Sequence, residues 1–135
     1  MKKIRIIIVE NDLDEQLFMQ EGFNLTGLFE IIRFADNGDE LLQLLGDSKE
    51  NLPEVILSDL NMHGKNGYDI LTAVKNDQAL SHIPVIITST SSIKMVIDRC
   101  KELGAYAFIL KPETFIEYKT FAEKLYQLII EDTVV

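Results

Sequence analysis

Short runs of consecutive apolar residues, rich in Ile and Val, recur along the 135-residue chain. Runs that are apolar at successive positions are typical of strands covered on both faces, as in a parallel sheet. We therefore expect a strand in each run. The runs are Ile4 to Val9, Val55 to Leu57, Val85 to Ile87 and Ala107 to Leu110, with a weaker candidate at Glu30 to Phe34.

Between these runs, apolar residues recur at spacings of three and four, which predicts helices that bury one face. The stripes comprise Leu41, Leu44 and Leu45; Ile70, Leu71 and Val74; Ile93, Val96, Ile97, Cys100 and Leu103; and Phe121, Ala122, Leu125, Leu128 and Ile129. The first helix is less regular. Leu13, Leu17 and Phe18 are expected to form its packing side, after an N-cap at Asn11 or Asp12.

Strands that alternate with helices predict a mostly parallel sheet with right-handed crossovers. Turn-forming residues and prolines fall between the expected elements, at Asn37-Gly38, Gly46-Asp47-Ser48, Pro53, His63-Gly64, Asn66-Gly67, Pro84 and Pro112. The sequence therefore predicts an α/β fold, a three-layer doubly wound arrangement of five βα units. At this length we expect one domain over residues 1–135.

Composition and charge narrow the classes of function. The formal net charge is −9 and the 13 Lys and Arg residues form no run, which argues against direct nucleic-acid binding. No apolar run approaches the roughly 20 residues that cross a bilayer, and the N-terminal run ends at Glu10 without a signal-peptide cleavage site. We expect no membrane association. The single cysteine, Cys100, lies on a helical stripe and predicts a buried, inert thiol in a cytoplasmic protein.

Polar residues follow four of the five expected strands, where parallel sheets bind ligands. They are Glu10, Asn11 and Asp12 after the first strand, Asp59 and Asn61 after the third, Ser89 and Thr90 after the fourth, and Lys111 after the fifth. Oxygen ligands suit Mg²⁺, a carboxylate can accept a phosphoryl group, and an ammonium group can hold a phosphate oxygen. The set predicts phosphoryl transfer at one rim of the sheet.

Four segments resemble the receiver domains of bacterial two-component systems. Ile-Ile-Ile-Val-Glu-Asn-Asp is similar to the family's first strand and acidic pocket, and residues 57–67, Leu-Ser-Asp-Leu-Asn-Met-His-Gly-Lys-Asn-Gly, resemble its phosphoacceptor segment. Residues 83–90 and 104–112 complete the match. The resemblance covers nearly the whole chain and implies the flavodoxin-like strand order 2-1-3-4-5 with five helices.

The resemblance also implies a role for each residue. Asp59 is the expected phosphoacceptor, Lys111 the phosphate-binding lysine and Ser89 the switch hydroxyl. Phe108 matches the aromatic residue that turns inward on phosphorylation, although it can also be simply core. Asn61 lends a backbone carbonyl to Mg²⁺.

The metal pocket departs from the family pattern. Glu10 and Asn11 stand where the family usually carries two carboxylates, and Asn11 takes the place of the direct metal ligand. An amide oxygen can still ligate Mg²⁺, but we expect weaker binding, for which Asp12 can compensate. Asn11 and Asp12 can also be only an N-cap, as Ser89 and Thr90 can be for a later helix.

His63 and His82 lie in turns without a nucleophile motif, so we expect them to be exposed rather than catalytic. His63 and Asn66 stand where the family usually has proline and aspartate, and we interpret both as turn positions.

The expected function is a phosphorylation-dependent switch, loaded by a sensor histidine kinase or phosphotransfer protein and acting on a downstream protein. Only one helix, to about Ile130, is expected after Lys111-Pro112, so no output domain is predicted unless the chain is a fragment. The resemblance implies that a homodimer can form through the fourth helix, fifth strand and fifth helix.

Two alternatives stay open. The first is a phosphorylation-independent pseudo-receiver that acts as an interaction scaffold, which Asn11 favours. The second is a flavodoxin-like electron carrier, which the acidic loop after the first strand disfavours because a flavin phosphate needs backbone donors and glycines.

Overall fold

The computed structural model describes residues 2–47, 51–61, 66–91 and 93–131. Strands and helices alternate along the chain as predicted, with one short 3₁₀ helix, η1, before the last helix. The strands are β1 (Ile4–Val9), β2 (Phe29–Ala35), β3 (Val55–Asp59), β4 (Val85–Ser89) and β5 (Ala107–Leu110). The helices are α1 (Leu13–Thr26), α2 (Gly38–Asp47), α3 (Gly67–Asn76), α4 (Lys94–Glu102), η1 (Phe115–Glu117) and α5 (Tyr118–Glu131).

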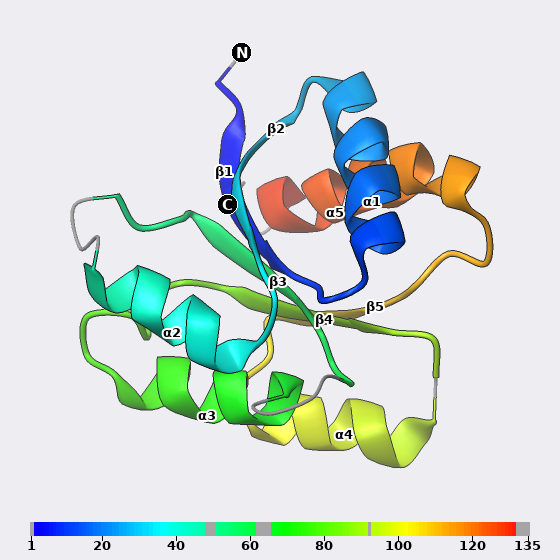
Figure 1. The fold of residues 1–135 in the computed structure, drawn as a ribbon. Coiled ribbons are helices and arrows are strands. Elements are labelled where there is room, and N and C mark those ends of the chain that lie inside the picture. The colour runs from blue at the N-terminus through cyan, green and yellow to red at the C-terminus, as the bar shows by residue number, and fades with distance from the viewer. Residues whose placement is uncertain (1, 48–50, 62–65, 92, 132–135) are drawn as a thin grey trace.

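The five strands form one sheet in the order β2-β1-β3-β4-β5, and every neighbouring pair is parallel. Figure 1 shows α1 and α5 on one side of this sheet and α2, α3 and α4 on the other. The predicted three-layer doubly wound fold and its 2-1-3-4-5 order are confirmed. Because all strands run the same way, their carboxyl ends lie along one edge, here called the carboxyl edge.

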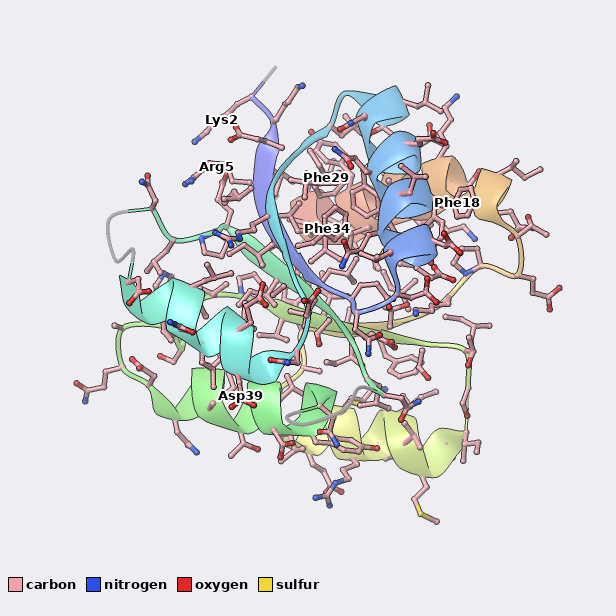
Figure 2. All side chains as sticks on the ribbon, in the orientation of Figure 1. Lys2, Arg5, Phe18, Phe29, Phe34 and Asp39 are labelled. Carbon is pink, nitrogen blue, oxygen red and sulfur yellow. The ribbon has the colours of Figure 1, made fainter. Side chains whose placement is uncertain are left out.

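The apolar runs form strands because side chains from both faces of the sheet are buried. On the α1/α5 face, Ile8, Leu57 and Ile86 belong to one core cluster. On the α2–α4 face, Val9 and Ile87 belong to the other. Phe18, Phe29 and Phe34, which are labelled in Figure 2, all pack in the α1/α5 cluster.

The predicted packing side of α1 is correct for Phe18, which packs in the α1/α5 cluster, but wrong for Leu13 and Leu17. Leu13 and Leu17 are 76% and 54% exposed, whereas Met19, Gly22 and Phe23 are buried. The reason is the approach of α5: a Cβ added at Gly22 would lie 2.6 Å from the Cβ of Tyr118. A glycine therefore marks the contact face of α1, and a pattern built from apolar side chains alone misses it.

The helix starts differ in how they are capped. Asp12 is the N-cap of α1 and its side chain accepts the Glu15 N–H, in agreement with the predicted alternatives. Asn66, interpreted as a turn residue, is instead the N-cap of α3 in a capping box with Asp69. The N-cap of α4 is Ile93, which supplies no side-chain hydrogen bond. Ser89 and Thr90 are therefore not the cap of α4.

The remaining expectations about single residues are mostly met. Cys100 is buried, and this burial raises the pKa of its thiol. His82 is exposed, while His63 lies outside the described residues. Among the residues that the structure describes, we find no helix with the length and apolar character needed to span a membrane.

Candidate functional site

Four strand ends bring the predicted site residues to the carboxyl edge. The backbone ladder extends one residue beyond β1, where the Glu10 N–H donates to Ala35, and beyond β5, where the Lys111 N–H donates to Ser89. Asp59 is the last residue of β3. Because side chains alternate along a strand, Glu10, Asp59 and Lys111 share the α1/α5 face.

Lys111 joins the two acidic residues from different strands. Its Nζ lies 2.7 Å from Oε1 of Glu10 and 3.4 Å from Oδ2 of Asp59. The side chains of Lys111, Glu10 and Asp59 are only 9%, 2% and 12% exposed. One ammonium group therefore neutralises one of two nearly buried carboxylates, and the three groups together keep one negative charge.

Both oxygens of the Glu10 carboxylate accept hydrogen bonds. Oε1 accepts from Lys111, and Oε2 accepts the Asp12 N–H at 3.1 Å. The amide of Gln16 donates to the Glu10 carbonyl at 2.6 Å. The loop between β1 and α1 is thus tied to this acid, and Glu10 is a buried carboxylate rather than a surface one.

The electrostatics of the cluster favour a protonated lysine and disfavour a second carboxylate charge. Burial raises the pKa of Asp59; the Lys111 charge opposes this rise and the Glu10 charge adds to it. Burial alone would lower the pKa of Lys111, but the hydrogen bond to Glu10 and the charges of Asp59, Glu10 and Glu15 raise it overall. Asp59 is left with excess negative charge that a cation could neutralise.

The donor set fits a hard divalent cation that also binds phosphate. Within the described ranges there is no group of three or more His, Cys, Asp or Glu residues placed to hold a metal. Mg²⁺ is usually held by one or two carboxylates together with phosphate and water oxygens, and Glu10 and Asp59 supply two. Asn11 and Asn61 are exposed at the same edge, and the Asn61 N–H donates to the Asp59 carboxylate.

The predicted switch residues lie on the opposite face of the sheet. Ser89 is 1% exposed, and its Oγ accepts the Ser91 N–H at 3.2 Å. Phe108 is half-buried against the α2–α4 core cluster. Thr90 is exposed. Ser89 and Phe108 come from neighbouring strands, β4 and β5, on the side that α4 covers.

The structure adds residues that the sequence did not reveal. Thr88 pairs in register with Asp59 and is 1% exposed, and its Oγ1 has no hydrogen-bond partner in the described part of the chain. The hydroxyl of Tyr118, at the start of α5, donates to the carboxylate of Glu15 in the first turn of α1. Neither Tyr118 nor Glu15 follows a strand, so the search of strand ends that located the other site residues could not find this pair.

A model of the response regulator receiver domain family matches residues 6–123, which include all four strand ends of the site. The chain belongs to this family. Receiver domains are parts of two-component response regulators, and membership of this family is consistent with phosphorylation-dependent switching.

Known proteins agree with this assignment. The receiver domain is 29% identical over 133 residues to the two-component response regulator ARR5 of Arabidopsis thaliana, covering 92% of this chain and 71% of that protein. It spans about half the length of other plant response regulators that it matches, 55% of the rice regulator ORR4 for example.

Solved structures show the same fold. The phosphorylated cyanobacterial phytochrome response regulator RcpA superposes with a TM-score of 0.84 at 24% identity, over 97% of this chain and 96% of that one. The response regulator Rcp1, solved in an Mn²⁺-bound form, has a TM-score of 0.80 at 21% identity, over 95% of each chain. At these identities the likeness shows the fold alone.

Proposed function

We propose that this receiver domain accepts a phosphoryl group on Asp59 from a sensor histidine kinase or a phosphotransfer protein. The observation that carries the proposal is the position of Lys111, whose ammonium group lies 3.4 Å from Asp59 while anchored at 2.7 Å on Glu10. A phosphoryl group on Asp59 would therefore meet a cation already held in place. RcpA, which has the same fold, was solved in a phosphorylated form.

The chemistry needs a free carboxylate oxygen and charge neutralisation. An oxygen of Asp59 attacks phosphorus while the bond between phosphorus and the donor's imidazole nitrogen breaks, and the imidazole leaves with the electron pair. Lys111 holds an oxygen of the transferred group as a point charge. The Asn61 N–H, which donates to the Asp59 carboxylate, orients the nucleophile.

Mg²⁺ is the metal that we propose for this site. Glu10 and Asp59 would hold it with their carboxylates, Asn11 with its amide oxygen and Asn61 with its backbone carbonyl, and Asp12 and Thr90 lie nearby on the rim. When bound, Mg²⁺ neutralises the charge that develops on the phosphoryl oxygens.

Phosphorylation would be read out on the other face of the sheet. The hydroxyl of Ser89 would move to bond a phosphoryl oxygen, and Phe108 would turn inward into the space that this movement opens. The surface of α4, β5 and α5 would then change its affinity for a downstream protein or a second copy. We place this activity in the cytoplasm, with no nucleic acid or membrane as a direct partner.

Labelling with a small phosphodonor tests the proposal. Incubation with acetyl phosphate and Mg²⁺ should add one phosphoryl group, detected by mass spectrometry of the intact protein. Asp59→Asn should abolish the addition, and Asp36→Asn, which alters an exposed carboxylate linked to Gln16 near the same edge, should leave it unchanged. Labelling that persists in Asp59→Asn would refute the assignment of Asp59.

A pseudo-receiver scaffold is the second candidate, because Asn11 stands at the metal position. Absence of labelling at saturating Mg²⁺, together with a partner that binds equally to wild type and Asp59→Asn, would favour it. Asn11→Asp should tighten Mg²⁺ binding about fivefold, the effect expected of one added charge pair in a largely aqueous setting. Unchanged affinity would remove Asn11 from the ligand set.

A further inference from the structure

Tyr118 is a buried tyrosine that the proposed chemistry does not use, although the charges of Glu10 and Asp59 act on it. It is the first residue of α5 and is 1% exposed. Its hydroxyl donates a hydrogen bond to the carboxylate of Glu15 on α1. Burial first, and then the Glu15 carboxylate, raises the pKa of the phenol, so that Tyr118 keeps its proton and stays a donor at neutral pH.

Close packing fixes the direction of this hydroxyl. A Cβ on Gly22 would approach the Cβ and backbone of Tyr118 to 2.6–2.8 Å, so α1 and α5 touch without a side chain between them. The Tyr118 ring also packs edge-on against Phe121, with ring centroids 5.5 Å apart. This packing restricts the positions that the phenol can take beside Glu15.

Hydrogen bonds connect Glu15 to Lys111 through the loop before α1. The Glu15 N–H donates to the Asp12 side chain, and the Asp12 N–H donates to the Glu10 carboxylate that binds Lys111. The charge of Glu15 is one of three carboxylate charges that raise the Lys111 pKa, with those of Asp59 and Glu10, against the opposing effect of burial. Lys111 contacts Glu10 and Asp59 directly. A third carboxylate free to turn toward this ammonium group would compete with a phosphoryl group for it.

We propose that Tyr118 is a positioning residue that holds the Glu15 carboxylate away from Lys111, so that the ammonium group stays available to Asp59 and its phosphoryl group. This inference rests on the proposed phosphorylation of Asp59. A phenol bound to a carboxylate makes a charge-assisted hydrogen bond, which is stronger than one between neutral groups. Without that donor, the half-buried Glu15 carboxylate would lose this partner and could turn toward Lys111, on which its charge already acts.

The test compares rates of labelling by acetyl phosphate. Tyr118→Phe keeps the ring and removes only the hydroxyl, and it should slow labelling of Asp59 by about three- to tenfold, the effect of one extra charge near the ammonium group. Adding Glu15→Gln to this variant removes the competing charge and should restore the wild-type rate. Tyr106→Phe is the matched control, because Tyr106 donates to the Leu128 carbonyl at the opposite edge of the sheet, and it should label like wild type.

Two outcomes overturn the proposal. If Tyr118→Phe labels at the wild-type rate, the hydroxyl has no positioning role. If Tyr118→Phe is slow and Glu15→Gln fails to restore the rate, Tyr118 acts only through packing.

A second measurement does not depend on phosphorylation. The ¹⁵N resonance of the Lys111 ammonium group, assigned by its loss in Lys111→Met, should shift in Tyr118→Phe and return in the double variant with Glu15→Gln. An unshifted resonance would contradict the proposal. If wild type is never labelled, the proposed function fails, and the ammonium resonance still decides whether Tyr118 controls Glu15.

Discussion

The two faces of the sheet carry different kinds of residue at the same carboxyl edge. On the α1/α5 face lie the charges, with Lys111 between Glu10 and Asp59. On the α2–α4 face lie a hydroxyl and an aromatic ring, those of Ser89 and Phe108. Because side chains alternate along each strand, Phe108 and Lys111, three positions apart at the end of β5, lie on opposite faces. The sheet thus divides the groups that would hold a phosphate from those that would report it.

The faces also differ in how closely their helices pack. On the charged face, Gly22 allows the backbone of α5 to touch α1 beside Tyr118. On the other face, Met95 of α4 is 79% exposed and Cys100 is the buried residue of that helix. The charged residues therefore lie where two helices pack closely, whereas α4 on the other face is held by one buried residue.

The largest difference in stability between the two faces is expected when a lysine on each face is replaced. Lys111→Met leaves two nearly buried carboxylates without their cation and should lower the free energy of unfolding by about 3 kcal/mol in EDTA. Lys94→Met, on the other face, breaks an exposed pair with Asp98 at 3.5 Å and should change little. Urea denaturation measures both. Equal effects would show that the charged cluster contributes no special stability.

Glycines test the difference in packing. Gly22→Ala forces a methyl group into the backbone of Tyr118 and should cost about 2 kcal/mol of stability. Gly46→Ala, in α2, meets nothing within 4 Å and should stabilise by about 0.5 kcal/mol through helix propensity. Thermal unfolding of both variants checks this. A tolerated alanine at position 22 would mean that α1 and α5 are free to separate.

Two hydroxyls at the same edge should respond in opposite directions. The Ser58 hydroxyl donates to the Asp59 carbonyl at 2.9 Å, so Ser58→Ala should lose about 1 kcal/mol. The Thr88 hydroxyl is buried without a partner among the described residues, so Thr88→Val should gain a few tenths of a kcal/mol up to about 1. Chemical denaturation distinguishes the two signs. A destabilised Thr88→Val would reveal that its hydroxyl is satisfied in solution.

The smallest effect, that of Asp59→Asn on stability, should depend on pH. The pKa of Asp59 is raised above its ordinary value of 3.8 by burial, against the effect of Lys111. Its contribution to stability is therefore full below 3.8 and is lost as pH rises through the folded-state pKa. In EDTA, Asp59→Asn should be more stable than wild type at neutral pH and lose this advantage in acid. The opposite trend in a pH series of melting temperatures would show that Lys111 outweighs burial.

Much of the fold could be predicted because both faces of the strands are buried, which makes the runs around Ile56 and Ile86 apolar at every position. The packing side of α1 was predicted only in part, because its contact with α5 combines apolar Met19 and Phe23 with Gly22 and a polar pair. Burial of a glycine is invisible to hydrophobic periodicity.

The site residues also divide into those that the sequence could locate and those that it could not. Glu10, Asp59 and Lys111 could be located because each ends or follows a strand, and parallel strands end together. Tyr118 and Glu15 are separated by 103 positions and meet only through the packing of two helices. Thr88 lies inside an apolar run, where a threonine is an ordinary strand residue.

The start of α4 has a consequence for local motion. Asp12 and Asn66 supply hydrogen-bonding side chains to the first turns of α1 and α3, whereas Ile93 supplies none to α4. An unsatisfied first turn opens at low free energy. Amide protons at the beginning of α4 should therefore exchange with deuterium sooner than those of α1 or α3, because the first turn of α4 can open without unfolding the rest of the domain.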